Sequence, residues 1–223
     1  MRSGSQHLEC RGIPCLAPQL TIDKMRVIAG TYRSRLLSAP RGMRTRPTSD
    51  RLRETLFNIL APRLNGCRFV DLYAGTGAVG IEALSRGAEH VWFAENAEPA
   101  LAALRQNLSA LKISRGFTLE DRGVGAMLQR LSKLPQPVDL VFLDPPYDAE
   151  DEYTGTLNFF GSERGRVALA PDALVISEHN SKIKLATHYG ALRHARLVKQ
   201  GDAALSFFGF AAVEKSPHPD AAQ

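Results

Sequence analysis

With 223 residues, 44% of them hydrophobic, the chain is long enough for one sizeable α/β core and a small appendage. Its formal net charge of +5 at pH 7 favours an anionic partner. The three cysteines and six histidines lack ligand spacing, which argues against a disulfide framework or metal site, and no stretch has the length and hydropathy of a membrane span or signal peptide. We therefore expect a cytoplasmic protein with neither a metal nor a membrane partner.

The positive charge is concentrated near the start of the chain. Residues 1–24 show no hydrophobic periodicity and are predicted to be a disordered leader. Between residues 26 and 53 there are eight arginines, no lysine and one acid, Asp50. This stretch is a candidate surface for an anionic partner, and the alternative is a solvated basic surface.

The segment 25–65 is predicted to contain a small hairpin, a basic loop and a helix. Short apolar runs at 27–30 and 35–37 favour the hairpin, and the stretch 40–47 is too rich in proline, glycine and arginine for regular structure. A serine N-cap and leucines at helical spacing then predict a helix over 50–60.

From residue 66 onward, apolar strands alternate with helices. The expected strands are 68–73, 90–95, 116–120 and 138–143, and the expected helices are 78–86, 97–110 and 123–133. This alternation predicts right-handed βαβ units, and thus an α/β, Rossmann-like domain over 66–213 whose mostly parallel sheet is covered on both faces.

Three further apolar runs predict additional strands at 173–177, 192–198 and 204–213. A short turn joins the last two, so we expect a hairpin and one antiparallel strand at the end of the sheet. The last residues, 214–223, are predicted to be a disordered tail.

A glycine-rich loop follows the first predicted strand of this domain. Residues 71–80 contain Gly-x-Gly-x-x-Gly, in which Gly75 and Gly77 let backbone N–H groups and the helix N-terminus face a ligand. Glu95, 20 residues after Gly75, ends the next strand, where an acid can accept both hydroxyls of a ribose. The pattern fits a nicotinamide cofactor or S-adenosylmethionine. Asp71 favours the latter, because it would repel a pyrophosphate but can pair with a methionine ammonium or brace the loop.

The tetrapeptide Asp144-Pro145-Pro146-Tyr147 follows the apolar strand 138–143, at the same expected edge of the sheet. Hydrogen bonds from a planar amino group to the Asp144 carboxylate and the Pro145 carbonyl would direct its lone pair toward a sulfonium methyl group. The alternative is a helix N-cap followed by a rigid turn. Glu178 and His179 follow the fifth strand near the same edge, and we interpret His179 as a packed or exposed histidine and not as a participant in the chemistry.

Four segments, 26–30, 46–57, 71–80 and 144–147, resemble the bacterial 16S rRNA guanine-N2 methyltransferases of the RsmD type, and the resemblance covers about residues 25–213. It implies a class I S-adenosylmethionine-dependent methyltransferase fold with a small N-terminal β-hairpin extension. The product implied is N2-methylguanine in 16S rRNA, made on an assembling or assembled 30S particle. Apart from the resemblance, our default expectation is a monomer.

The resemblance also assigns roles to residues. Asp71, Gly75 and Gly77 would hold the methionine end of S-adenosylmethionine and Glu95 its ribose, and the flipped guanine would lie against Asp144, Pro145 and Tyr147. Gly125 occupies the position where the family has an acid beside the adenine, so Asp121 is the candidate there. The arginines would bind and stack on RNA. Our RNA-binding candidates are Arg33, Arg35, Arg44, Arg46 and Arg51.

Three other functions fit part of the sequence. An adenine-N6 methyltransferase acting on DNA would use the same tetrapeptide. An RNA-binding assembly factor would keep only the basic segment and a vestigial cofactor site. A nicotinamide oxidoreductase would use the glycine loop, but no hydride-transfer acid or base accompanies that loop in the sequence.

Overall fold

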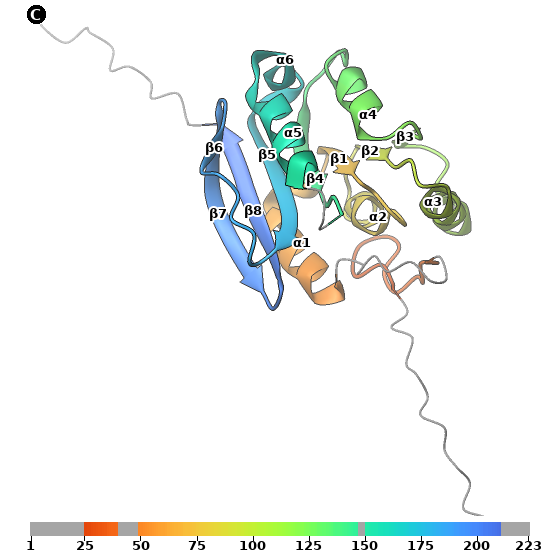
Figure 1. Cartoon of the computed structure of the whole chain (residues 1–223). Helices are drawn as coiled ribbons and strands as arrows, with labels where there is room; N and C mark the ends of the chain where they lie inside the picture. The colour runs from red at the N-terminus through yellow and green to blue at the C-terminus, as the bar shows by residue number, and fades with distance from the viewer. Residues whose placement is uncertain (1–24, 40–48, 147–149, 211–223) are drawn as a thin grey trace, which may run out of the picture.

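The structure is a computed structural model that describes residues 25–39, 49–146 and 150–210. It contains an eight-stranded sheet in the order β3-β2-β1-β4-β5-β8-β7-β6, with helices on both faces (Figure 1). The strands are β1 (Arg68–Leu72), β2 (His90–Ala94), β3 (Phe117–Glu120), β4 (Val138–Leu143), β5 (Leu169–Asn180), β6 (His188–Tyr189), β7 (Leu192–Gln200) and β8 (Ala203–Phe210). The helices are α1 (Asp50–Leu64), α2 (Ala78–Ser85), α3 (Glu98–Ala110), α4 (Val124–Leu131), α5 (Glu150–Gly161) and α6 (Glu163–Arg166).

The first five strands form the predicted parallel half of the sheet: β1 pairs with β2 and β4, β2 with β3, and β4 with β5. Their residues alternate between two hydrophobic clusters. One cluster includes the buried faces of α1, α2 and α3, and the other those of α4 and α5. The predicted α/β fold with both faces covered is therefore confirmed, and burial on both faces explains why these strands read as nearly continuous apolar runs.

The register of this half aligns the ends of its strands. Leu72 of β1 pairs with Ala94 and Leu143, and Leu143 pairs with Ser177 of β5. The residues that follow these four positions therefore lie along one edge of the sheet, the carboxyl edge, where open α/β sheets bind their ligands.

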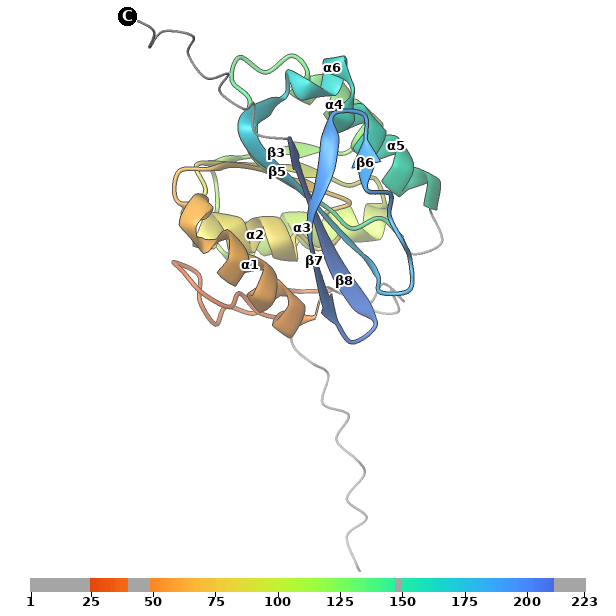
Figure 2. The same ribbon diagram turned by 90° about the vertical axis from the view of Figure 1, so that its left-hand side faces the viewer.

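The C-terminal hairpin corrects one prediction. β7 and β8 pair antiparallel as expected, but β8 lies inside the sheet, antiparallel to β5 and between β5 and β7 (Figure 2). The predicted place for the antiparallel strand, at the end of the sheet, was therefore wrong. The residues of β8 are mostly apolar, so they are suited to a position inside the sheet, where most of them are buried. β7 carries several charged residues, which suit a more exposed strand.

Other differences concern the extents of elements. α1 runs past the predicted end at residue 60 because Leu60 and Leu64 continue its buried face. β5 begins four residues earlier than expected, and α5, α6 and β6 were not predicted. No helix among the described residues is long and apolar enough to cross a membrane.

The N-terminal hairpin is smaller than the two predicted strands. Its ladder is a single antiparallel bridge between Arg26 and Leu36, and the Leu37 N–H donates to the Met25 carbonyl at 2.8 Å. The turn of the hairpin is bound by α2. The N–H groups of Ile28, Ala29, Thr31 and Tyr32 all donate to acceptors on that helix. The predicted leader 1–24, basic loop 40–47 and tail 214–223 lie outside the described residues.

Candidate active site

The glycine loop between β1 and α2 has the backbone that its glycines predict. Gly75 and Gly77 both have positive φ, at 56° and 80°. A Cβ on Gly77 would also lie 2.2 Å from Cδ1 of Leu104, so a side chain there would push against α3. Gly77 is the N-cap of α2 and has no side chain to cap it, so the start of this helix offers N–H donors to a ligand.

Asp71, at the end of β1, braces this loop. Its carboxylate is 1% exposed and accepts the Gly80 N–H at 2.8 Å, which satisfies one of the N-terminal donors of α2. Burial raises the pKa of Asp71 from 3.8 to about 7, the Gly80 hydrogen bond opposes the rise, and the charge of Glu95 adds to it. An ammonium group beside Asp71 would favour its charged form.

Glu95 follows β2 and lies on the other side of the loop. Its Oε2 accepts the Gly75 N–H at 2.8 Å, and its Oε1 accepts the N–H groups of Asn96 and Ala97, both at 2.8 Å. Three backbone donors therefore hold the carboxylate beside the loop; both lone pairs of Oε1 are used, and Oε2 retains one lone pair for a hydroxyl group.

Asp144 and Pro145 follow β4 at the same edge. Pro145 is buried, and its carbonyl accepts a hydrogen bond of 3.3 Å from the Tyr153 hydroxyl of α5, which orients it. Asp144 is half-buried, and its pKa is raised well above its ordinary value by burial first, then by Glu178 and Asp71. Tyr147 lies outside the described residues.

Asp121, the candidate adenine contact, is on the surface. Its side chain is 57% exposed and pairs with Arg105 at 3.2 Å. The buried acid at the end of β3 is the preceding residue, Glu120, which binds Arg122 at 2.8 Å and Arg130 at 3.3 Å. The structure thus leaves Asp121 accessible but engages it with a neighbouring helix, and its contact with adenine stays a prediction.

The N-terminal segment docks on α2 through a buried glutamate that sequence reasoning missed. Glu82 is fully buried and accepts the Ile28 N–H at 2.7 Å and the Ala29 N–H at 3.0 Å, while Arg86 pairs with the same carboxylate at 2.7 Å. A glutamate flanked by apolar neighbours within an otherwise apolar helix is the signal that could have revealed it.

Gly30 makes the closest approach of this segment to α2. It has a φ of 82°, and a Cβ there would lie 1.8 Å from the Ser85 carbonyl oxygen. That carbonyl accepts the Thr31 N–H at 2.8 Å, and the Ser85 hydroxyl accepts the Tyr32 N–H at 2.9 Å. The glycine of the segment 26–30 is therefore required by a backbone-to-backbone contact.

Asn107 of α3 joins the N-terminal segment to the glycine loop. Its Oδ1 accepts the Ser38 N–H at 2.7 Å, and its Nδ2 donates to the carbonyls of Ser38 at 3.1 Å and Thr76 at 2.9 Å. The Thr76 hydroxyl also contacts the Met25 sulfur at 3.8 Å. Asn107 is 1% exposed on the leucine-lined face of α3, an unusual place for an amide and again a usable signal. The N-terminal segment therefore lies against the glycine loop.

Three of the five candidate RNA-binding arginines lie among the described residues. Arg33 and Arg35 are exposed on the hairpin, and Arg51 is exposed at the start of α1. Arg44 and Arg46 lie outside the described residues. Arg53 was not among the candidates and is fully buried, where it donates to Asp50 at 2.9 Å and to the Arg26 carbonyl.

Of the two alternatives that the sequence left open for His179, packed or exposed, the structure shows the packed one. His179 is 2% exposed, its Nε2 lies 2.8 Å from the Ser206 hydroxyl, and burial lowers its pKa. Among the described residues, no three His, Cys, Asp or Glu side chains are grouped so that they could hold a metal ion.

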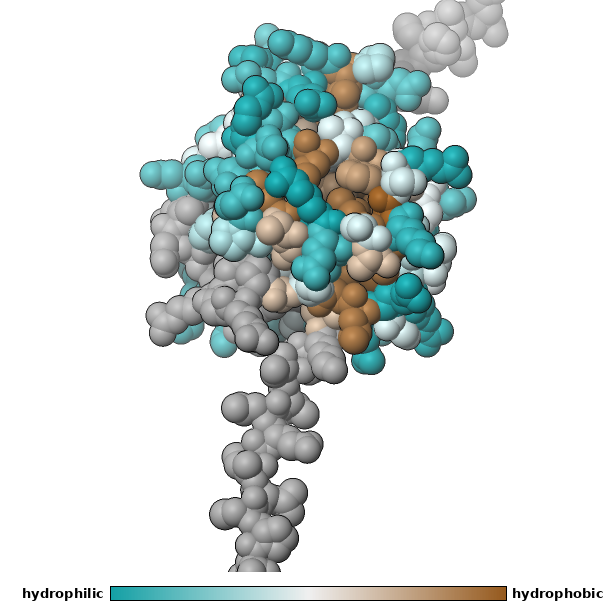
Figure 3. Space-filling model, turned by 90° about the vertical axis from the view of Figure 1, so that its right-hand side faces the viewer, coloured by the Kyte–Doolittle hydropathy of each residue, from teal (hydrophilic) through white to brown (hydrophobic). Residues whose placement is uncertain are grey.

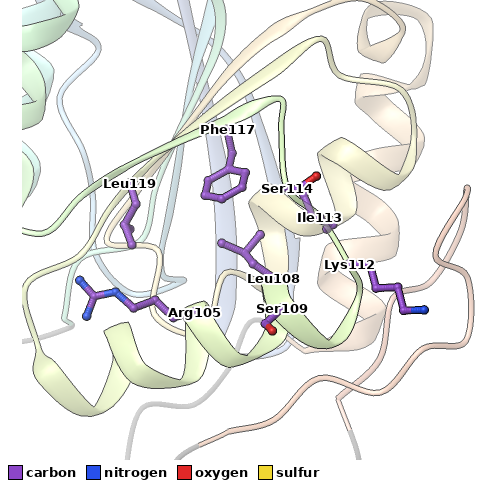
Figure 4. A pocket seen from close by; sticks show the side chains of 8 residues that line it. All are labelled: Arg105, Leu108, Ser109, Lys112, Ile113, Ser114, Phe117 and Leu119. Carbon is purple, nitrogen blue, oxygen red and sulfur yellow. The ribbon is translucent and has the colours of Figure 1, made fainter.

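A hollow of about 560 Å³ lies away from the carboxyl-edge site, between α3 and the edge strand β3 (Figure 4). Leu108, Phe117 and Leu119 form much of its wall, with Arg105 and Lys112 nearby. The face of the molecule that carries α3 and β3 has apolar side chains gathered at its centre and hydrophilic ones around them (Figure 3). This hollow shares none of its lining residues with the glycine loop or the Asp144 turn.

Solved structures identify the class of protein to which this fold and site belong. An Escherichia coli structure named "Putative methyltransferase yhhF" is 30% identical, has a TM-score of 0.71, and is matched over 85% of this chain and 99% of its own. A Thermus structure named as hypothetical protein TTHA0928 is 26% identical, with a TM-score of 0.67 over 82% of this chain and 97% of its own. The predicted class I methyltransferase fold is confirmed.

The family follows from the sequence matches. Residues 25–209 match the family model described as "Conserved hypothetical protein 95". A Bacillus subtilis protein named "Putative rRNA methyltransferase YlbH" is 34% identical over 75% of this chain and 89% of its own length. The Escherichia coli "Ribosomal RNA small subunit methyltransferase D" is 37% identical over 56% of this chain and 61% of its own length, so the matched region spans less than two thirds of that relative. The chain belongs to this family, and the RsmD-type resemblance is confirmed.

Proposed function

We propose that this protein transfers a methyl group from S-adenosylmethionine to the exocyclic N2 of a guanine in 16S rRNA. One observation carries the proposal: the Asp144-Pro145 turn and the glycine loop lie at the same edge of the sheet, in a family with relatives named as small-subunit rRNA methyltransferases. The choice of guanine N2 rests on the RsmD-type resemblance.

The residues around the loop fit S-adenosylmethionine. The buried Asp71 carboxylate suits the ammonium of the methionine moiety, and the uncapped start of α2 at Gly77 suits its carboxylate. Glu95, held by three backbone N–H groups, suits the ribose hydroxyls. When bound, the cofactor supplies a methyl group on a positively charged sulfur.

Asp144 and Pro145 would position the substrate amino group. The amine donates one N–H to the Asp144 carboxylate and the other to the Pro145 carbonyl, which directs its lone pair at the methyl carbon. The nitrogen would form the new bond to the methyl carbon supplied by the cofactor, with the electrons of the broken sulfur–carbon bond left on sulfur, and the alkylated nitrogen would then lose one proton. Asp144 is suited to take it because burial, Glu178 and Asp71 raise its pKa. Tyr147 is proposed to stack on the base.

The basic segment is proposed to hold the RNA backbone while the base is flipped. Exposed Arg33 and Arg35 lie on the hairpin, which binds Glu82 of α2 and contacts the loop through Met25, and exposed Arg51 lies on α1, which packs against α2. Phosphates bound by these arginines would lie on the side of the molecule that carries α2. Arg44 and Arg46 remain candidates for the same role. We propose that the enzyme acts as a monomer in the cytoplasm, on an assembling or assembled 30S particle.

Mass mapping of 16S rRNA from a strain that lacks the gene tests the product. We expect one N2-methylguanine to be absent and to return when the gene is restored. N6-methyladenine in DNA as the only product would favour the adenine methyltransferase. Failure of the purified protein to bind S-adenosylmethionine in a calorimetric titration would favour a noncatalytic assembly factor.

Asp144→Ala tests the mechanism. We expect methyl transfer to fall by at least about 10³-fold, because both positioning and proton acceptance are lost, while cofactor affinity stays within a few-fold. Asp151→Ala is the matched control, since this aspartate is exposed on α5. Normal turnover of the Asp144 variant would contradict the mechanism.

A further inference from the structure

A second carboxylate stands beside Asp144 at the carboxyl edge. Leu143 of β4 and Ser177 of β5 are register partners in a parallel pair, so the next residues, Asp144 and Glu178, follow side by side on neighbouring strands. β4 and β5 are adjacent in the sheet order, and their ribbons run together (Figure 1).

The two carboxylates also lie near each other. Phe142 and Ile176 are partners whose side chains belong to the cluster packed against α1, α2 and α3. Because side chains alternate along a strand, Glu178, two residues after Ile176, points to that same side, as does its partner Leu205 on β8. Asp71 shares this side, since its partner is Phe142. Asp144 follows the end of β4, and the charges of both Glu178 and Asp71 act on its carboxyl group, which indicates that it lies near them.

Burial makes this pair electrostatically costly. Glu178 is 2% exposed and Asp144 is half-buried. After burial itself, the charge of Glu178 is the largest cause that raises the pKa of Asp144. Groups whose pKa values are perturbed by burial and by a neighbouring like charge are frequent at functional sites.

The Watson–Crick edges of the bases differ beside the reactive amine. Guanine places an N1–H donor next to its N2 amino group. Adenine places the N1 lone pair next to its N6 amino group, and cytosine places the N3 lone pair next to its N4 amino group. Ionised carboxylates only accept hydrogen bonds, so two adjacent carboxylates in this form complement the two adjacent donors of guanine and repel the lone pair of the other bases. Hydrogen bonds from the two guanine donors would favour the ionised form of both groups against the effect of burial and like charge.

We propose that Glu178 is a base-reading residue, whose carboxylate accepts the N1–H of the guanine that Asp144 and Pro145 hold by its N2 amino group. The assignment rests on the proposed function and adds to it a reason for choosing guanine over adenine. A site built to bind an N–H group rejects an analogue without it strongly, because its buried polar group is then left facing a lone pair.

The test replaces the target guanine, once mapped, by 2-aminopurine in reconstituted small-subunit rRNA. This base keeps the reactive 2-amino group but carries a lone pair at N1. We expect wild-type kcat/KM to fall by about 10²-fold or more on 2-aminopurine. In Glu178→Gln the side-chain amide can rotate and donate to N1, so the guanine-to-2-aminopurine ratio should shrink at least about tenfold. 2-Aminopurine also lacks the O6 of guanine, but this loss is the same for the wild type and the variant. The change in the ratio therefore reports on Glu178 alone.

Asp172→Asn is the matched control. It neutralises a carboxylate on the same strand, with a side chain that is 80% exposed and paired to Arg63, and should leave the ratio unchanged. Melting temperature and S-adenosylmethionine affinity establish that the Glu178 variant is folded.

The outcomes separate the inference from the proposed function. A Glu178→Gln variant that slows both substrates equally would make Glu178 a structural residue and overturn the inference. A wild-type ratio near one would overturn it without any variant, even if the product is N2-methylguanine and the proposed function holds. If the wild-type product is methyladenine, both fail, because adenine has no N1–H for Glu178 to accept.

Discussion

Asp71→Asn should make the protein more stable at neutral pH. The Asp71 pKa is about 7 in the folded protein against 3.8 for the ordinary side chain, so between these values the folded state binds more protons than the unfolded state. The free energy of unfolding of the wild type therefore falls as pH rises through this window, by about 1.4 kcal/mol per pH unit. Asparagine stays neutral and can still accept the Gly80 N–H, so the variant avoids this loss.

The expected magnitude follows from the same window. From pH 5 to pH 8, the stability advantage of the variant over the wild type should grow by about 2 to 3 kcal/mol and level off above pH 7. Urea unfolding at a series of pH values measures it, provided that the two proteins have equal m values. Asp172→Asn, at an exposed carboxylate, should show no such growth. An Asp71 variant whose advantage does not change between pH 5 and pH 8 would refute the reasoning.

Cofactor affinity should move in the opposite direction. If Asp71 pairs with the methionine ammonium, Asp71→Asn weakens S-adenosylmethionine binding while it stabilises the fold. Wild-type affinity should also rise between pH 5 and pH 7 as Asp71 ionises, and the affinity of the variant should change less. Titration calorimetry at several pH values measures both. Equal affinities would leave Asp71 only its role of bracing α2 through Gly80.

Two further predictions concern the docking of the N-terminal segment. Gly30→Ala places a methyl group 1.8 Å from the Ser85 carbonyl at a φ of 82°, so we expect a loss of at least about 2 kcal/mol in stability and weaker RNA binding, measured by urea unfolding and filter binding. An unchanged unfolding midpoint would show that the segment docks differently. Asn107→Leu removes the partners of Ser38 and Thr76, so stability should fall by about 2 to 4 kcal/mol and cofactor affinity should fall with it, while Asn107→Asp keeps the acceptor for Ser38 and should lose less. An unchanged cofactor affinity in Asn107→Leu would show that the docking of the N-terminal segment does not affect cofactor binding at the glycine loop.

Much of the site was predictable because its signals are local. The glycine loop, the acid that ends β2 and the Asp144-Pro145 turn each follow an apolar strand within a few residues, and parallel strands bring such ends to one edge. The sequence left two roles open for Asp71, pairing with the cofactor or bracing the loop. The structure shows that Asp71 accepts the Gly80 N–H, which braces the loop. The two residues are only nine positions apart, but the bond forms only because of the direction in which α2 follows the loop.

By itself, the sequence determined the alternation of strands and helices, the parallel half of the sheet and the acids and glycines that follow its strands, because strand and helix periods and turn residues act over short distances. Tertiary structure alone decided that β8 lies inside the sheet, that Glu82 and Asn107 hold a segment 54 and 69 residues away from them, and that Glu178 stands beside Asp144. These features depend on which distant backbone groups and strands meet in the folded core, and hydrophobic periodicity carries no information about those pairings.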